Sequence, residues 1–414
     1  MKILIVHPGT QHSAKLAAAL KSGNNEVLLI TTVYKKKGSI TGFLASFLPQ
    51  SEKKRLESRV NASLIDSDIM PMCELRGLLL LAIARIDKKK KFYTVYKRVV
   101  AKAVGKKAAR FACAHDYDAV ISFDSYSMYL FEELGKHHYK GITITDYSAA
   151  YAPYAKNVYL KQIESHPQLS ETLMAERPVL WNNKYFEDMQ KEPSFPQYII
   201  CASSYTKKTL TTYGICGEKI SIIPYGYNPA LPPIEKKQNS SIFNFLFVGN
   251  VSVMKGIHLL IYAFREINDS TIRLTLVGNP QKTIQEMSIN DKNITLKGYV
   301  PHNELYKEYL DANVFVFPSL SDGFGFAPLE AMCYGVPCIV SKSSGIADII
   351  SDGIDGIIIE DNSVEAIRRA MVMCMNDKEK ILTMGCRAKE KALKHTLENY
   401  IAELNTYIDG LGSK

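Results

Sequence analysis

The sequence has no apolar run that is long enough to cross a membrane. Its longest apolar stretch, GLLLLAIARI from Gly77 to Ile86, falls well short of the ~20 residues that a spanning helix needs, and it ends in a basic tract. The apolar run at the amino terminus, KILIV, is too short for a signal peptide and is typical of a first strand instead. We therefore expect a protein that is made and kept in the cytoplasm.

Cysteine is present but is not arranged for disulfides or metal binding. The eight cysteines show no CxxC spacing, and several lie in apolar runs such as YIICAS and CIVS. In such surroundings a thiol acts as a small hydrophobic side chain. The pattern indicates a reducing compartment and predicts no metal site.

Several catalytic and nucleic-acid-binding signatures are also missing. No Ser-His-Asp, HExxH, Walker or GxGxxG pattern occurs in a context that would support it. No helix-turn-helix, RNA-binding or zinc-finger pattern is present either, so we expect no nucleic acid partner. The remaining sources of function are charge and a set of glycine turns that follow strands.

Positive charge is abundant and uneven. The formal net charge is +9, and the stretch from Arg85 to Arg110 holds eleven basic residues against one acid, Asp87. A solvated helix face is one interpretation. The other is a surface for anionic lipid or a lipid-linked phosphate, because each lysine near such a surface contributes ~1 kcal/mol and the interleaved apolar residues suit an interfacial helix. The candidate membrane surface runs from Lys88 to Arg110.

Strand and helix signals alternate along nearly the whole chain, which is typical of parallel sheets covered by helices. Six short β-rich runs precede the segment YNPALPPIEKKQNSS, from Tyr227 to Ser241, and six follow it. This segment is rich in proline, lysine and serine, so it is the best candidate for a domain boundary. Two Rossmann-like domains in series place a ligand cleft between them, at the carboxyl ends of the strands.

The stretch DGFGFAPLEAM combines a glycine turn with two carboxylates. A strand-like run precedes it and a helical pattern follows, so backbone N–H groups of the turn can point at an anion. Pro328 suits the first position of the helix, which places Glu330 in its first turn and Asp322 across the glycine turn. Because carboxylates accept hydrogen bonds from hydroxyls, the arrangement fits a nucleotide sugar. The simpler alternative is that Asp322 closes the loop and Glu330 complements the helix dipole.

From about Phe245 to Glu360 the sequence resembles the C-terminal domain of the family 4 retaining glycosyltransferases (glycosyl transferases group 1). The family pattern is Glu-Gly-Phe-Gly, four further residues, then Glu-Ala, and it stands here as DGFGFAPLEA, followed by GVP. The resemblance implies the α/β GT-B fold, with two Rossmann-like domains facing each other across a cleft. It implies an N-terminal acceptor domain over residues 1–226, a donor domain over 227–395, and a helix over 396–414 that crosses back to the first domain.

The same resemblance implies a retaining, metal-independent glycosyltransferase that moves a sugar from a nucleotide diphosphate sugar to a hydroxyl acceptor, with no separate cofactor. Bacterial-type polysaccharide or glycoconjugate assembly is the expected setting, and the acceptor is a glycan or a lipid-linked sugar. Catalysis would depend on positioning and on stabilising the departing diphosphate. The alternative is a non-catalytic subunit that binds a partner enzyme or a glycan, because three family positions differ here.

Catalytic and donor-binding roles follow from the motif positions. Asp322 would contact the donor sugar, Glu330 the nucleotide ribose and Lys255, at the start of the next helix, the diphosphate. The family arginine is missing, because Asn250 follows the strand-ending glycine and Met254 precedes the lysine. The further donor-binding candidates line the two glycine turns and the nucleobase pocket: Gly249, Asn250, Gly298, Val300, Gly323, Phe324, Gly325, Phe326 and Ala327.

In the N-terminal half, the loop HPGTQHS occupies the place of a glycine-containing family loop that lies near the donor phosphates and the acceptor. It makes Gly9 a donor-binding candidate. Further along, Asp146 follows Thr145 at a place where many relatives carry His-Asp, so the role of that histidine is absent or passes to Asp146. The acceptor-side candidates are Thr10, Gln11, His12 and Asp146.

Overall fold

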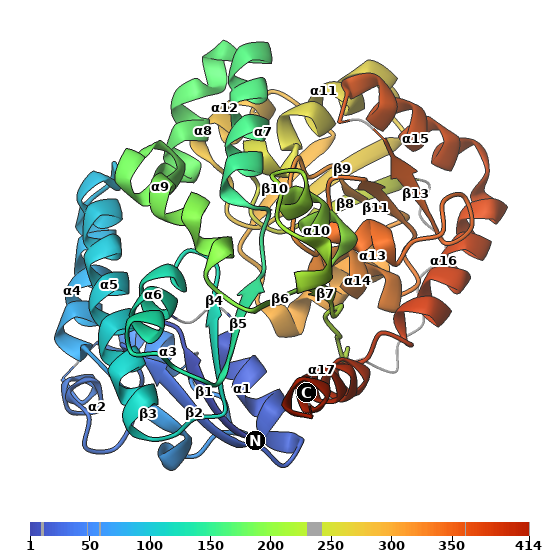
Figure 1. Cartoon of the computed structure of the whole chain (residues 1–414). Coiled ribbons are helices and arrows are strands. Elements are labelled where there is room, and N and C mark those ends of the chain that lie inside the picture. The colour runs from blue at the N-terminus through green and yellow to red at the C-terminus, as the bar shows by residue number, and fades with distance from the viewer. Residues whose placement is uncertain (10–11, 48, 58, 230–241, 361, 414) are drawn as a thin grey trace.

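The structure, a computed structural model, describes residues 1–9, 12–47, 49–57, 59–229, 242–360 and 362–413. Each half of the chain forms one parallel β-sheet with helices around it (Figure 1). The predicted α/β architecture with two Rossmann-like sheets is confirmed. The proline-rich segment from Tyr227 to Ser241 follows the last strand of the first sheet in sequence and precedes the first strand of the second, and its residues 230–241 fall outside the described residues.

The first sheet has the strand order β3-β2-β1-β4-β5-β6-β7, and all its pairs are parallel. Its central strands are buried over most of their length, as expected for a parallel sheet that is covered on both faces. The strands are β1 (Lys2–Val6), β2 (Glu26–Thr31), β3 (Ile69–Pro71), β4 (Ala119–Phe123), β5 (Ile142–Tyr147), β6 (Tyr198–Cys201) and β7 (Ile220–Ile222).

Strand β3 is the one strand that the sequence runs do not predict. It has three residues and lies at the edge of the sheet, paired only with β2. It ends in Pro71, which lacks the N–H that a central strand needs, so an edge is the position it can take.

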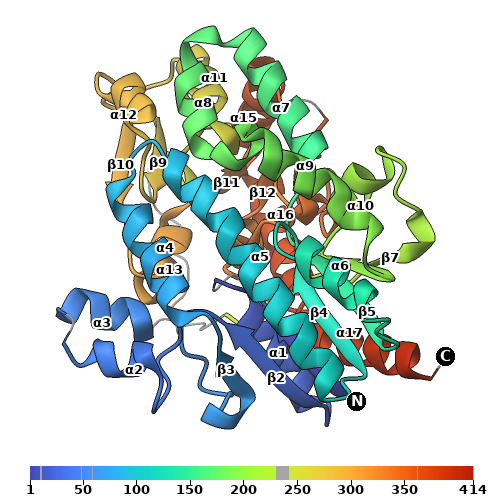
Figure 2. The same cartoon turned by 60° about the vertical axis from the view of Figure 1, so that its left-hand side comes forward.

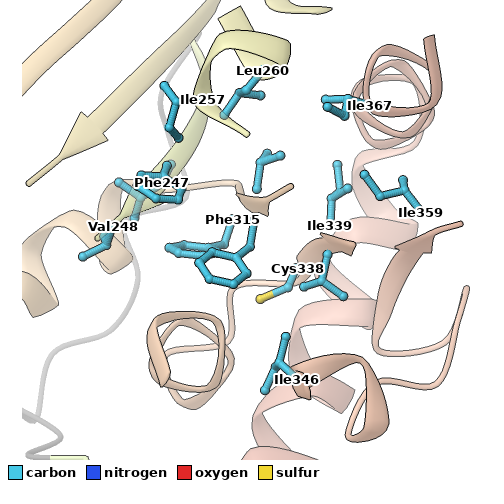
Figure 3. Close-up of a cluster of buried hydrophobic side chains, with 14 of the residues drawn as sticks. Phe247, Val248, Ile257, Leu260, Phe315, Cys338, Ile339, Ile346, Ile359 and Ile367 are labelled. Carbon is cyan, nitrogen blue, oxygen red and sulfur yellow. The ribbon is translucent and has the colours of Figure 1, made fainter. Parts of the chain in front are cut away.

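The second sheet has the order β10-β9-β8-β11-β12-β13, again with parallel pairs. Phe247, Phe315 and Ile339 from its middle strands are fully buried, and Ile367 lies over Ile339 from a covering helix (Figure 3). The strands are β8 (Phe243–Val248), β9 (Ile272–Val277), β10 (Ile294–Gly298), β11 (Val314–Phe317), β12 (Cys338–Ser341) and β13 (Gly356–Ile359).

Helices cover both sheets (Figures 1 and 2). In the first half they are α1 (Ser13–Ser22), α2 (Ile40–Ala45), α3 (Gln50–Glu57), α4 (Glu74–Ile86), α5 (Lys91–Ala114), α6 (Met128–Lys136), α7 (Ala152–Ser165), α8 (Ser170–Glu176), α9 (Asn183–Lys191) and α10 (Ser204–Thr211). In the second half they are α11 (Ile257–Ile267), α12 (Lys282–Ser288), α13 (Leu305–Asp311), α14 (Phe326–Cys333), α15 (Val364–Asn376), α16 (Lys378–Ala392) and α17 (Leu397–Gly412).

Two segments join the halves. Helices α7 to α9 belong to the first half by sequence, but Tyr159, Leu173 and Met189 on them share one hydrophobic core with the second sheet. Conversely, α17 lies beside α1 (Figure 1), where Leu404 and Ile408 join the core of the first sheet. The chain therefore exchanges helices between its halves, and this exchange holds the two sheets in a fixed relation.

Candidate active site

The glycine turn lies at the carboxyl end of β11, and neighbouring chain segments fix its first residue. The Asp322 N–H donates to Ser343 O at 3.0 Å, and Gly345 N–H donates to Asp322 O at 3.1 Å. These bonds pair Asp322 with the segment that follows β12. The carboxylate of Asp322 is thereby placed by backbone bonds on both sides.

Lys255 and Asp322 meet through their side chains. The Lys255 ammonium forms an ion pair with Asp322 Oδ2 and lies 5.3 Å from the centroid of the Phe317 ring. The lysine side chain is 27% exposed and the aspartate 17%, so a ligand can reach the pair. Two residues that are distant in sequence are therefore brought together at this turn.

The position of Lys255 differs from the prediction that it opens a helix. It ends the 3-10 turn Val253–Lys255, and α11 begins two residues later. Gly256 between them has φ +73°, and a Cβ there would lie 2.0 Å from Pro318 O. Only glycine fits so close to the end of β11. Helix α11 therefore begins after Gly256, and Lys255 belongs to the turn before the helix.

The aspartate that replaces the family glutamate has a local role. Its Oδ1 atom accepts a hydrogen bond from Phe324 N–H at 3.2 Å, while Oδ2 faces Lys255. Such a bond to the amide two residues on is a turn that the short Asp side chain favours. The shorter acid thus closes the glycine turn as well as pairing with the lysine.

Helix α14 begins earlier than predicted. Phe326 is its first residue and Gly325, with φ +97°, precedes it in the left-handed region. Pro328 is therefore the third helical residue, and Glu330 lies in the second turn. The proline is tolerated because N–H groups of the first turn have no partner within the helix.

Glu330 is held by groups from several elements. Its Oε2 atom accepts a hydrogen bond from the Tyr309 hydroxyl at 2.9 Å. Burial raises the pKa of Glu330, and the Tyr309 hydroxyl, His302 and Lys15 offset part of that rise. Since Lys15 lies on α1 of the first domain, the carboxylate faces charge from across the domain boundary.

The first domain contacts the glycine turn directly. Gly323 O accepts a hydrogen bond from Ser203 Oγ at 2.6 Å. A Cβ on Gly323 would lie 2.0 Å from Ser148 O, so the two backbones approach as closely as glycine allows. The turn is therefore in contact with both domains.

Tyr225 joins the two domains with its ring. It stacks on Phe326, with centroids 5.4 Å apart and planes at 12°. It also meets Phe324, His12 and Tyr400 edge to face. This aromatic cluster links the glycine turn to α1 and to the final helix.

His12 and Asp146 form an ion pair. His12 Nε2 lies 2.6 Å from Asp146 Oδ2 and 3.2 Å from the Tyr225 hydroxyl. Burial lowers the pKa of His12, but the Asp146 carboxylate more than offsets this, so the pKa is raised. Of the other candidates in the first loop, Gly9 N–H donates to His7 Nδ1 at 2.9 Å, while Thr10 and Gln11 lie outside the described residues.

The remaining donor-side candidates gather at the ends of β8, β9 and β10. Gly278 N–H donates to Gly298 O at 2.8 Å, and a Cβ on Gly278 would lie 1.7 Å from Gly249 O. Val300, two residues after Gly298, is half-buried, and Asn250 is exposed. Thus Gly249 and Gly298 are close together, on either side of Gly278.

Some residues that complete the site were not predicted from the sequence. Lys15, Tyr225 and Tyr309 come from three different elements and share no motif spacing with the glycine turn. Glu176 is a fourth, because its carboxylate accepts from Ser252 Oγ at 2.6 Å just before Lys255. One signal was available: Tyr225 follows the last strand of the first sheet, where ligand sites of α/β folds occur.

Comparison with known proteins identifies the second half of the chain. The family described as glycosyl transferases group 1 matches residues 233–391. An uncharacterised glycosyltransferase of Methanocaldococcus jannaschii is 29% identical over 206 residues, which are 49% of this chain and 56% of that protein. The O-antigen chain mannosyltransferase RfbU of Salmonella typhimurium is 32% identical over 158 residues, 36% of this chain and 44% of that protein. The chain spans about half the length of the curated relatives it matches.

Solved structures resemble the whole chain. Anabaena HepE in complex with UDP superimposes with a TM-score of 0.65 at 14% identity, covering 100% of both chains. The sucrose-phosphate synthase of Thermosynechococcus elongatus gives a TM-score of 0.64 at 16% identity, covering 100% of this chain and 99% of that one. At such identities the likeness concerns the fold, which is GT-B. Residues 233–391 of the chain are similar to the glycosyl transferases group 1.

Proposed function

We propose that the chain is a retaining glycosyltransferase that moves a sugar from a nucleotide diphosphate sugar to a hydroxyl acceptor without a metal ion. The observation that carries this proposal is the placement of Lys255, Asp322 and Glu330 around one glycine turn, which itself contacts the first domain. The cation suits a diphosphate, and the two acids suit the hydroxyls on either side of it.

The proposed chemistry uses the Lys255–Asp322 pair as a preformed set of charges. When the donor enters, its diphosphate competes with Asp322 for the ammonium, and the freed carboxylate accepts sugar hydroxyls. As the bond from the sugar to the diphosphate breaks, negative charge grows on the leaving oxygen, and Lys255 stabilises it. Retention follows either from attack on the same face, guided by the leaving phosphate, or from a covalent intermediate.

The names of the relatives support a setting in polysaccharide assembly. One is a capsular polysaccharide biosynthesis glycosyltransferase of Staphylococcus aureus, 27% identical over 215 residues. Another is the O-antigen chain mannosyltransferase B of Escherichia coli, 27% identical over 195 residues. We propose a hydroxyl-bearing glycan or lipid-linked acceptor of this general kind.

The direct test of this function is slow hydrolysis of the donor in the absence of an acceptor. The chain is incubated with UDP- and GDP-sugars, and released nucleotide diphosphate is measured by phosphorus NMR. We expect release from one nucleotide class, with the sugar freed first as the anomer present in the donor. Release of the opposite anomer would contradict retention.

Glu330 gives the function a pH dependence with a definite sign. Burial raises the pKa of Glu330, so the carboxylate is lost at a higher pH than an ordinary glutamate. Donor affinity should fall as the pH drops through that raised pKa, because the ionised form makes the stronger hydrogen bonds to hydroxyls. Tyr309→Phe removes the hydroxyl hydrogen bond that lowers the pKa of Glu330. In this variant donor affinity should therefore begin to fall at a higher pH, and the loss of affinity should reach about tenfold.

Donor KM measured between pH 5 and pH 8 checks this expectation. Tyr306→Phe is the matched control, because Tyr306 lies on the same helix α13 and makes no hydrogen bond through its hydroxyl to a described residue. If Tyr309→Phe and Tyr306→Phe gave the same pH profile as the unaltered chain, Glu330 would not contact the donor.

We also propose that the first domain rests on an anionic membrane surface at its cytoplasmic face. Two cations of the surface predicted from Lys88 to Arg110 already have acidic partners within the chain. Arg98 pairs with Asp188 and Arg110 with Glu133. One face of α5 is also buried in the domain core. Besides the outer face of α5, the turn between α4 and α5 remains exposed.

This turn mixes apolar and cationic side chains. Ile86 is 81% exposed and Phe92 is 77% exposed, and both line a groove together with Lys88, Lys89 and Lys91. Helix α2, which packs against α4 (Figure 2), adds Phe43, and Phe47 follows the helix; both are largely exposed. None of the helices in the described parts of the chain could span a bilayer, so the proposed contact is interfacial.

Neutralising Lys88 to Lys91 with glutamine should weaken binding to anionic vesicles at least tenfold in a sedimentation assay, since each lysine contributes ~1 kcal/mol. The control replaces four exposed lysines of the second domain, Lys378, Lys380, Lys389 and Lys394, which changes the net charge equally. Vesicle binding that falls equally in both variants, or in neither, would count against this surface.

A further inference from the structure

A hollow of about 520 Å³ opens in the first domain beside the Gly9 loop. Its walls come from the ends of β1 and β2, from α4 and α5, from the turn after β4 and from the segment after α8. The carboxyl ends of parallel strands are where α/β folds bind ligands. Glu176 lines the hollow and bonds to Ser252, so the hollow adjoins the segment that carries Lys255.

Cations outnumber acids on these walls, and the acids already have partners. Asp124 accepts hydrogen bonds from Ser148 N–H at 3.1 Å and from Ser148 Oγ at 3.0 Å. Glu176 accepts from Ser252 and from Gln281 Nε2, the latter at 3.2 Å. The four cationic side chains that line the hollow are Arg59, Lys90, Lys97 and Arg177.

Lys97 and Arg177 stand out among these cations. Both are half-buried, and neither forms an ion pair with any residue in the described part of the chain. The Lys97 ammonium lies 4.7 Å from the centroid of the Tyr126 ring instead. Burial lowers the pKa of Lys97 and the nearby Arg177 guanidinium lowers it further, while Tyr93, Asp124 and Glu192 offset part of that fall. Two half-buried like charges destabilise each other, and an anion bound between them would relieve this.

The hollow also has an apolar wall, beside the hydroxyl-bearing side chains of Thr32, Ser125 and Tyr126. Val33, Leu80, Leu81, Ala84 and Val179 line it alongside the cations. Along α4 the apolar wall continues to Ile83 and Ile86, which line the groove at the α4–α5 turn. A phosphate joined to an apolar chain matches both the cationic part and the apolar part of this wall.

We propose that this hollow is the acceptor site and that it takes a lipid-linked acceptor whose phosphate binds Lys97 and Arg177. The inference rests on the proposed glycosyltransferase function and names the class of its acceptor. The apolar chain leaves along α4 toward the membrane-facing turn, and the acceptor hydroxyl faces the donor beside Gly9. Arg177 and Lys97 are binding residues and take no part in the bond-breaking step.

Calorimetric titration of the whole chain with hexyl phosphate tests the proposal. Neutral hexyl glucoside and inorganic phosphate are the comparison ligands. We expect hexyl phosphate to bind more tightly than either. Lys97→Met and Arg177→Gln should each weaken it about tenfold, the effect of losing one charge-assisted hydrogen bond. Lys107→Met on α5 and Arg387→Gln on α16, both exposed, are matched controls that should leave the affinity unchanged.

Three results would overturn the proposal. If hexyl phosphate bound no better than hexyl glucoside, the hollow would not be an anion site. If it bound no better than inorganic phosphate, the apolar wall would not bind a lipid chain. The affinity for hexyl phosphate could also fall in Lys255→Ala and stay unchanged in Arg177→Gln, which would place the phosphate in the donor site. Failure here is distinct from failure of the proposed function, because donor hydrolysis is measured without any acceptor.

Discussion

Lys255→Ala should lower the rate of nucleotide diphosphate release by about 10²–10³-fold, the usual cost of removing one group that stabilises transition-state charge. The reason is local. Asn250 and Met254 fill the positions where the family places an arginine, so Lys255 is the cation that the motif supplies beside Asp322. The rate is measured by phosphorus NMR at saturating donor.

Lys342→Ala is the matched control for this variant. Lys342 belongs to the same domain and also pairs with a carboxylate, Glu360 at 2.6 Å, but both side chains are largely exposed. Exposed ion pairs contribute little to stability, so this variant should release nucleotide diphosphate at the normal rate. A Lys255→Ala variant that is folded and fully active would show that the leaving diphosphate is stabilised elsewhere.

Gly323→Ala should lower sugar transfer about 100-fold, although it adds only one methyl group. The new Cβ would lie 2.0 Å from Ser148 O and 2.8 Å from Ser148 C, both backbone atoms of the first domain. The turn and the first domain must move apart by about 1 Å to relieve this contact, and a misplacement of that size costs about 10²-fold in rate. Transfer and donor affinity are measured on the same variant.

The two readouts separate a domain effect from a binding effect. Donor affinity should change little, because Lys255, Asp322 and Glu330 all lie in the second domain. Gly135→Ala is the control, since a Cβ at Gly135 would meet nothing within 4 Å. If Gly323→Ala transferred sugar at the normal rate, the contact between the turn and Ser148 would have no part in catalysis.

Hydrophobic runs predict most of the fold, because a strand in a parallel sheet is buried on both faces and stands out as an apolar segment. The runs KILIV and FNFLFV became β1 and β8 on this basis. Strand β3 escaped because its three residues are too few to form a run. The starts of α11 and α14 were displaced by Gly256 and Gly325, whose left-handed conformations depend on contacts that no local pattern reveals.

The candidate site was predicted only as far as its motif extends. The motif at one glycine turn and one strand end predicts the two acids and the lysine. The ion pair between Lys255 and Asp322 is visible only in the folded chain. Tyr309 and Tyr225 reach the site from α13 and from the end of β7. Arg177 could not be predicted either, because its place near Lys97 depends on how the turn Pro178–Trp181 after α8 packs against α5.

The central claim is that a nucleotide diphosphate sugar binds at the turn between Asp322 and Glu330. Calorimetric titration of the whole chain with a panel of UDP- and GDP-sugars tests it most directly. One nucleotide class should bind, with one site per chain. Glu330→Ala should weaken this binding at least tenfold, because hydrogen bonds to an ionised group are worth about 1.5–3 kcal/mol. Absence of binding by every donor in the panel would contradict the account and favour a non-catalytic subunit.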